Sequence, residues 1–93
     1  MRHLHFFDGG FKYDQITIKE ARRRFLSGER ILICAAKIKP FNPWGGTFFI
    51  KAADHPEEEP GAVFDHYVNS FTWYNCNYEV GKYPVFYKEE AAQ

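Results

Sequence analysis

The sequence predicts an α+β domain in which two helices accompany a small antiparallel sheet of three to four strands. An amphipathic segment with helix-capping residues lies near the start, and a second helical spacing of apolar residues begins at Phe64. Short runs of β-branched and aromatic residues, bounded by proline and glycine, lie between and after these segments and are typical of strands. A chain of 93 residues has room for one domain, which we expect to span residues 1–93.

The first half of the chain predicts a helix over 18–27. The opening HLHFF before the turn DGG is compatible with a short first strand. Thr17 and Glu20 then have the spacing of a capping box, and Gly28 is placed to end the helix in the left-handed conformation. The apolar positions of this helix fall on one face: Ile18, Ala21 and Phe25.

Two strands should follow, joined by the loop PFNPWGG. RILICAAKIK predicts a strand over 30–39 that is apolar on both faces, as expected of an inner strand, and TFFIKA predicts a strand over 47–52. Successive side chains of a strand point to opposite faces, so Phe48 and Phe49 must lie on different sides of the sheet. We expect one of them in the core and the other covered by a second layer, a partner or a base.

The last third predicts a helix over 62–74 and a final strand in YPVFYKE. We expect Phe64, Val68 and Phe71 to be buried, in the same core as Phe25 and Ile33. The expected helix breakers are Asn75, Asn77 and Gly81, which makes 73–78 a connection. Pro84 lacks an N–H, which favours an edge strand or a position without a ladder hydrogen bond. With the first strand included, the order β-α-β-β-α-β matches the ferredoxin-like arrangement.

Composition excludes several classes of protein. The formal net charge is zero, whereas a general nucleic-acid coat protein is normally basic. Two cysteines do not make a disulfide framework, the start MRHLHFF has no secretory signal pattern, and no stretch approaches the ~20 apolar residues of a membrane span. We therefore expect a soluble cytoplasmic protein, a monomer or a homodimer, that has no membrane partner.

No motif predicts catalysis, a metal or a cofactor. His3 and His5 share one strand face, but a zinc site needs more ligands than these two. His55, His66 or Cys34 could add them in space, and two ordinary histidines are the preferred interpretation. Cys76 with His66 would need a contact geometry that the sequence does not show. Cys34 lies inside an apolar strand and is expected in the core. The sequence therefore predicts a protein that is not an enzyme.

Charged runs offer two binding hypotheses. Arg22, Arg23 and Arg24 fan around the first helix, either as a solvated face or, with Lys19 and Arg30, as a nucleic-acid-binding patch. Glu57, Glu58 and Glu59 form either a solubilising turn or an acidic contact for a basic partner.

Aromatic residues supply the preferred partner-binding site. Its predicted members are the large amphipathic rings of Trp44, Trp73, Tyr74 and Tyr78, with the three glutamates beside them. Asn75 and Asn77 would hold the 73–78 loop in one shape. Two alternatives stay open: these rings close the core, or Tyr74, Cys76 and Tyr78 line a small-molecule pocket.

The tract FDHYVNSFTWYNCNYEVGKYPVFY resembles small uncharacterised α+β proteins of bacterial phages and mobile elements. The likeness rests on the YNC step, the turn Glu79–Gly81 and the tyrosine-rich end, and it covers the last third of the chain. No activity is known for that group, so no site residue is carried over. The resemblance implies an accessory protein that binds and regulates or inhibits a protein partner, such as a host defence component. The alternative is a nucleic-acid-binding module.

Overall fold

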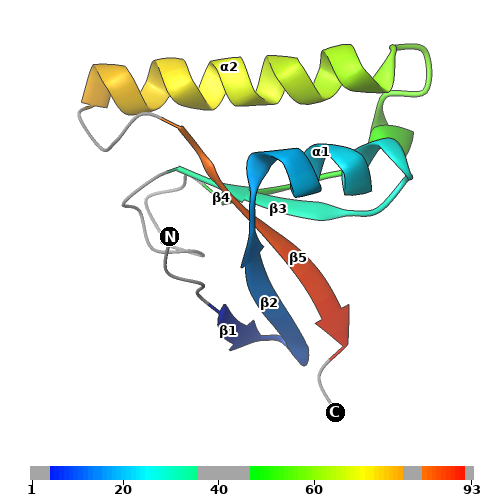
Figure 1. The fold of residues 1–93 in the computed structure, drawn as a ribbon, viewed down its shortest axis with the longest axis vertical. Helices are drawn as coiled ribbons and strands as arrows, with labels where there is room; N and C mark the ends of the chain where they lie inside the picture. Colours follow the sequence, from blue (N-terminus) through cyan, green and yellow to red (C-terminus); the bar gives the residue numbers. More distant parts are fainter. Residues whose placement is uncertain (1–4, 36–46, 79–82, 92–93) are drawn as a thin grey trace.

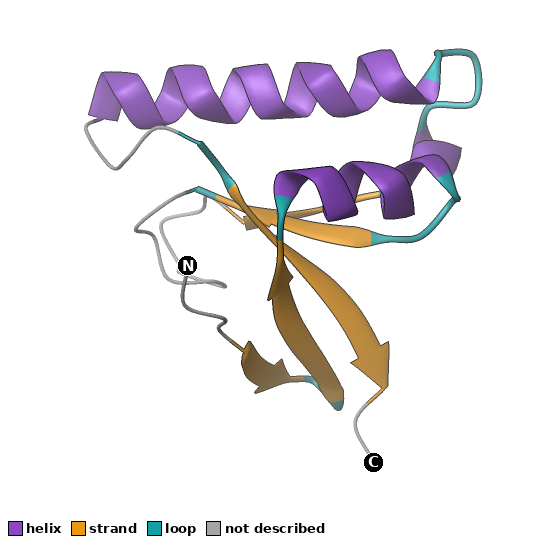
Figure 2. Ribbon diagram, in the orientation of Figure 1, coloured by secondary structure: helices purple, strands orange, loops and turns teal. Residues whose placement is uncertain are grey.

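Two helices lie on one face of a five-stranded antiparallel sheet in the computed structural model, which describes residues 5–35, 47–78 and 83–91 (Figure 1). The elements follow the chain as β1 (His5–Asp8), β2 (Phe11–Ile16), α1 (Ile18–Leu26), β3 (Ile31–Cys34), β4 (Thr47–Ile50), the 3-10 turn η1 (Ala52–Asp54), α2 (Pro60–Tyr78) and β5 (Val85–Ala91). Figure 2 shows the helices and the strands as separate layers. The predicted α+β class is confirmed, and the sheet has five strands rather than three to four.

The last strand lies inside the sheet, whose order is β1-β2-β5-β3-β4. β5 pairs with β2 on one side, from Phe11↔Ala91 to Ile16↔Phe86, and with β3 on the other. From β2 onward the elements follow the predicted order β-α-β-β-α-β, and β1 is added before them. Pro84 therefore precedes a central strand, so of the two predicted alternatives the edge strand was wrong and the position without a ladder hydrogen bond is confirmed. The missing N–H of Pro84 falls before the first ladder residue, Val85.

The β1–β2 hairpin contains a strand that the sequence prediction missed. Gly9 and Gly10 have φ of 56° and 84°, and they join Asp8 to its partner Phe11. Two consecutive positive φ values characterise the tight turns whose twist matches that of a hairpin, and glycine adopts them without strain. The pair of glycines after HFFD was the available signal for a second strand in FKYDQI.

Helix α1 forms where its caps predict. The Thr17 hydroxyl oxygen accepts a hydrogen bond from the backbone N–H of Glu20 at 3.1 Å, and Gly28 ends the helix with a φ of 98°. Ala21 and Phe25 are buried, so the amphipathic face meets the core as expected. The predicted span 18–27 is confirmed to within one residue.

Helix α2 is longer than predicted and includes residues 73–78. The Asn77 side-chain amide donates to the Trp73 carbonyl at 2.8 Å, and the Thr72 hydroxyl donates to the Val68 carbonyl at 2.7 Å. These bonds to the preceding turn are compatible with helix, whereas the prediction assumed that asparagine would break it. Asn75 is fully buried on the stripe that continues from Phe71. The expected loop was therefore wrong.

Each face of the sheet carries its own cluster of buried residues. The cluster under the helices contains Ala21, Phe25, Ile31, Ile33, Ile50, Val63, Phe64 and Phe86. The cluster on the opposite face contains Tyr13, Leu32, Cys34 and Tyr87, with Phe6 and Val85 packed against it. The burial of Phe25, Ile33 and Phe64 is confirmed, as is the prediction that β3 is apolar on both faces. Residues 36–39 of that predicted strand lie outside the described residues. Val68 and Phe71 are half-buried at the rim of the first cluster rather than inside it.

Candidate functional site

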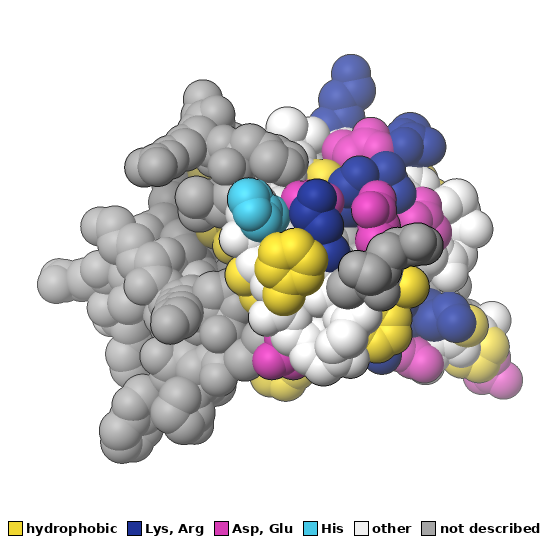
Figure 3. Space-filling view, turned by 90° about the horizontal axis from the view of Figure 1, so that it is seen from below, with side chains coloured by type: hydrophobic (Ala, Val, Ile, Leu, Met, Phe, Trp, Pro, Cys, Tyr) yellow, Lys and Arg dark blue, Asp and Glu magenta, His cyan; other side chains and the backbone are white. Residues whose placement is uncertain are grey.

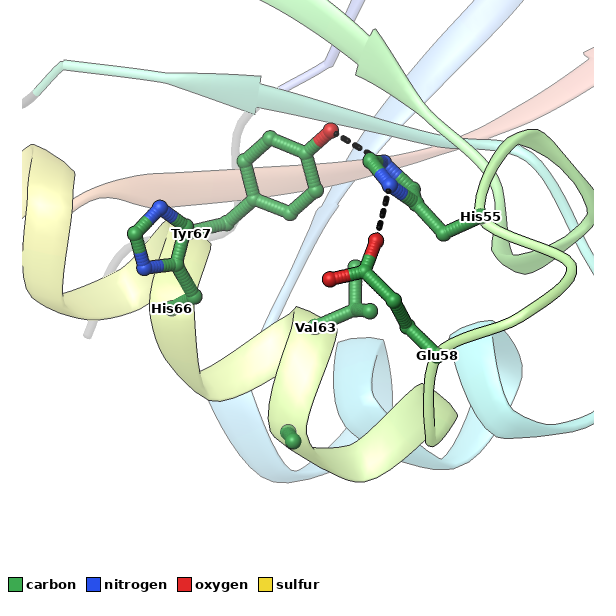
Figure 4. Close-up of a pocket in the computed structure, with 6 residues that line it drawn as sticks. His55, Glu58, Val63, His66 and Tyr67 are labelled. Atoms are coloured by element: carbon green, nitrogen blue, oxygen red, sulfur yellow. Dashed lines mark hydrogen bonds and ion pairs between the residues drawn. The ribbon is translucent and has the colours of Figure 1, made fainter.

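A shallow open pocket of about 360 Å³ lies beside the first half of α2 (Figure 4). It is lined by His55, Glu58, Ala62, Val63, His66 and Tyr67. His55 follows the 3-10 turn η1, and its backbone N–H donates to the Ala52 carbonyl at 3.0 Å. This bond holds the backbone from which the His55 side chain extends. The pocket therefore joins the segment between β4 and α2 to the helix itself.

The His55 ring is held on both of its nitrogens. Nδ1 lies 2.9 Å from a Glu58 carboxylate oxygen, and Nε2 lies 2.9 Å from the Tyr67 hydroxyl. In Figure 4 the Glu58 and Tyr67 side chains reach this ring, whereas the His66 ring turns away from it. The arrangement is a linear chain of carboxylate, imidazole and phenol.

The chemistry of the hydrogen-bonded group of Glu58, His55 and Tyr67 favours a structural role over a catalytic one. Burial raises the pKa of Tyr67, and the negative charges of Asp54 and Glu58 raise it further. The phenol therefore stays protonated and suits a donor role toward Nε2, which leaves Nδ1–H to donate to Glu58. Neither nitrogen of His55 is then available as a base for a substrate unless one of these two hydrogen bonds breaks.

The three glutamates before α2 have separate surroundings. Both Glu59 carboxylate oxygens accept backbone N–H groups of the first helical turn, from Gly61 at 3.0 Å and from Ala62 at 2.7 Å. These two bonds, together with the charge of Arg22, lower the pKa of Glu59 despite its partial desolvation. Glu58 binds His55, and Glu57 is exposed. Two of the three carboxylates therefore have partners within the chain.

The four arginines of the predicted nucleic-acid-binding patch are all paired with carboxylates. Their ion pairs are Arg22 with Asp65 at 3.4 Å, Arg23 with Glu20, Arg24 with Glu20 at 3.0 Å and with Glu29 at 2.9 Å, and Arg30 with Glu89 at 2.6 Å. Lys19 is exposed at the start of the same helix. Basic and acidic side chains also lie next to one another on the face drawn in Figure 3. The residues predicted to bind nucleic acid thus form part of a mixed surface.

The predicted partner-binding residues that the structure describes are not brought together. Trp73 is 68% exposed and Tyr74 is half-buried near the end of α2, whereas Glu59 caps its beginning, about 20 Å away along the helix. Tyr78 ends the helix, and its side chain lies outside the described residues, as does Trp44 altogether. Of the two rings of this set that the structure describes, Trp73 is largely exposed and Tyr74 is not.

The alternative sites are also separated. Cys76 and His66 lie on one helix about 15 Å apart along its axis, so they do not form a nucleophilic pair. Tyr74 and Cys76 point about 200° apart around α2 and do not line one pocket. Cys34 is buried as predicted, which raises the pKa of its thiol. His3 is outside the described residues, among which no group of three metal-ligating side chains gathers.

Strand β4 presents two rings that the sequence had singled out. Phe48 is 58% exposed and meets the Phe71 ring edge-on at 5.9 Å on the helix side. Phe49 is 38% exposed on the opposite side, where the Arg30 guanidinium lies 4.0 Å from its ring centroid. The prediction that Phe48 and Phe49 lie on opposite sides of the sheet is confirmed. The expectation that one ring would be core was wrong, because β4 is an edge strand and the adjacent layer covers each ring only in part.

A group of hydrogen-bonded polar side chains on the sheet face away from the helices was not predicted from the sequence. The Tyr13 hydroxyl donates to Glu89 Oε2 at 2.8 Å, and Arg30 donates to both oxygens of the same carboxylate, at 2.6 and 3.3 Å. Burial and the bond to Glu89 raise the pKa of Tyr13 to about 12. Burial opposes the ionisation of Glu89, but the bonds from Arg30 and Tyr13 outweigh it and lower the pKa of Glu89.

Comparisons of the chain with protein-family models, with curated proteins and with solved structures found no match. None of the helices in the described part of the chain is long and apolar enough to span a membrane.

Proposed function

We propose that this protein binds another protein along the open edge of β4, with Phe48 and Phe49 as its anchors, and that it acts by binding rather than by catalysis. The observation that carries the proposal is the exposure of two phenylalanine rings on one edge strand. Within the described residues, β4 pairs with β3 on one side and with no strand on the other. Such an edge offers backbone donors and acceptors to an added strand.

The two rings extend this edge on both faces. Phe48 prolongs the apolar surface of the helix side through Phe71, and Phe49 does so on the far side beside Arg30. Aromatic and arginine side chains are enriched among the residues that contribute most to protein–protein affinity. A partner strand laid along β4 would therefore bury apolar area on both sides of its backbone.

A protein partner is favoured over nucleic acid because the arginines have carboxylate neighbours. A phosphate backbone would have to compete with Glu20, Asp65 and Glu89 for the same guanidinium groups. Affinity for nucleic acid comes mainly from cations that neutralise phosphates. Trp73, exposed on the outer side of α2, is a third ring that a large protein partner would cover.

The absence of catalysis belongs to the same proposal. His55 is the best-placed general base among the described side chains, and both of its nitrogens already have partners. The resemblance of the last third to small phage and mobile-element proteins is the reason to expect a cytoplasmic protein target that is regulated or inhibited.

The test compares two exposed phenylalanines on the two edges of the sheet. Phe48→Ser removes the proposed anchor on β4, and Phe7→Ser removes a ring that is 64% exposed on β1. Each variant and the parent protein are immobilised, and partners are captured from an extract of the native host with and without nuclease. Thermal unfolding checks that both variants keep their structure.

We expect a nuclease-resistant protein partner that is retained by Phe7→Ser and lost by Phe48→Ser. Protection of residues 47–50 from hydrogen exchange in the complex would place the contact on β4. Equal capture by both variants would contradict the proposed edge, and recovery of nucleic acid alone would support the alternative class.

A further inference from the structure

The two sides of the β4 edge differ in charge. On the helix side Phe48 contacts Phe71, and the neighbouring strand residues Ile33 and Ile50 are buried and apolar. On the opposite side Phe49 lies under Arg30. A strand added to this edge would therefore meet hydrocarbon on one face and a cation on the other.

Lys51 adds a second cation to the far side. Its backbone stays extended after β4, with φ of −151° and ψ of 136°, so alternation directs its side chain to the side of Phe49. Lys51 is exposed, and none of the described carboxylates lies within 4 Å of its amine. Arg30 is neutralised by Glu89, so Lys51 carries the uncompensated positive charge at this edge.

We infer that the partner segment is an extended strand with alternating apolar and acidic residues. Its apolar side chains would lie on the Phe48–Phe71 side, and its acidic side chains would lie on the opposite side, beside Lys51. The period of two in a strand makes such a segment complementary to β4 on both faces at once. This inference rests on the proposed function, because it names the chemistry of the chain that would occupy the same edge.

The probes are two blocked peptides, Val-Glu-Val-Glu-Val and Val-Lys-Val-Lys-Val, titrated into the full-length ¹⁵N-labelled protein at low salt. We expect the glutamate peptide to shift the amide signals of residues 47–51 and to bind about fivefold more tightly than the lysine peptide, as an exposed ion pair allows. Lys51→Glu should reverse this order. Lys19→Glu, which makes the same change in net charge on α1, should leave the order as it is.

Several outcomes would overturn the inference. Three of them are equal binding of both peptides, failure of both to bind, and an unchanged preference in Lys51→Glu. The fourth is a concentration-dependent dimer in sedimentation in which residues 47–50 are protected from hydrogen exchange. The last outcome would make a second copy of this chain the occupant of the edge. The capture experiment with Phe48→Ser decides separately whether a protein partner binds at this edge, so a failure of this inference can be told apart from a failure of the proposed function.

Discussion

The two faces of the sheet are both buried at their centres, but their chemistry differs. Under the helices the contacts are hydrocarbon, with the Phe64 ring stacked on Phe86 at 5.3 Å and tilted against Phe25 at 5.6 Å. On the other face the rings surround a chain of ionisable groups, in which Glu89 accepts from Tyr13 and from Arg30. Apolar burial has no titratable group, so the far face is where folding should depend on pH.

The same difference bears on function. A face stabilised by apolar area tolerates changes of charge, whereas a face stabilised by a partly buried, hydrogen-bonded carboxylate such as that of Glu89 requires each member to keep its partner. Strand β4 borders both faces, with Phe48 on the first and Phe49 on the second. A partner at this edge would therefore contact two chemically distinct surfaces.

The largest effect is expected on the helix side. Phe64→Ala should lower the free energy of unfolding by about 3–5 kcal/mol, because it removes a fully buried ring from between two others. Urea denaturation followed by tryptophan fluorescence measures the loss. A loss under about 1 kcal/mol would mean that α2 does not pack on the sheet with this phase.

Glu89→Gln should cost less, about 1.5–3 kcal/mol, because it weakens the charged hydrogen bonds that join β5 to Tyr13 and Arg30. The matched control is Glu90→Gln, the next residue of β5, whose more exposed carboxylate pairs with Lys88 and should matter by about 0.5 kcal/mol or less. The same denaturation experiment compares them at neutral pH. Equal effects of the two variants would deny the far-face network any special role.

The pH dependence follows from the directions of two pKa shifts. The pKa of Glu89 is lowered in the folded protein, so its contribution is present above the ordinary value of 4.5 and is lost as pH falls through the folded pKa. The pKa of Tyr13 is raised from 10.0 to about 12, so its contribution is present below pH 10.0 and is lost as pH rises toward 12. Denaturation midpoints across pH should show both losses in the parent protein, and the acid loss should shrink in Glu89→Gln.

Phe71→Ala should cost about 1–2 kcal/mol, since the ring is half-buried at the rim of the helix-side cluster and keeps one partner in Phe48. This loss in the free energy of unfolding should lie between the losses expected for a core ring and for a surface ring. A cost as large as that of Phe64→Ala, in the same denaturation assay, would place Phe71 inside the core.

Local signals explain which elements could be predicted from the sequence. The first helix has a side-chain cap at Thr17 and a glycine stop at Gly28, and both signals act within a few residues. Strand β2 was missed because FKYDQI mixes charged and aromatic residues, so its alternation is weak. The end of the second helix was missed because the Asn77 side chain donates to the Trp73 carbonyl of the preceding turn, which is compatible with helix. Whether asparagine makes this bond or ends a helix depends on the surroundings of the helix.

The far-face network and the residues of the proposed binding edge were harder to predict because their contacts are distant in the chain. Tyr13 and Glu89 are 76 positions apart, and nothing around either residue indicates the other. The orientation of Phe48 and Phe49 to opposite faces did follow from alternation alone. Their exposure did not, because it depends on β4 lying at the edge, and the strand order of a sheet is not written in any one segment.

The smallest expected effect separates the two faces on a single strand. Arg30 lies over the Phe49 ring at 4.0 Å, so Phe49→Leu combined with Arg30→Gln should show a coupling energy of about 0.5–1 kcal/mol in a double-mutant cycle. Phe48→Leu is the matched variant, since Phe48 is the adjacent residue and faces Phe71 instead. Its coupling to Arg30→Gln should lie near zero. If both phenylalanines couple equally to Arg30, the charge of Arg30 acts on the whole edge rather than on one face, and the proposed separation of an apolar and a cationic side of β4 is wrong.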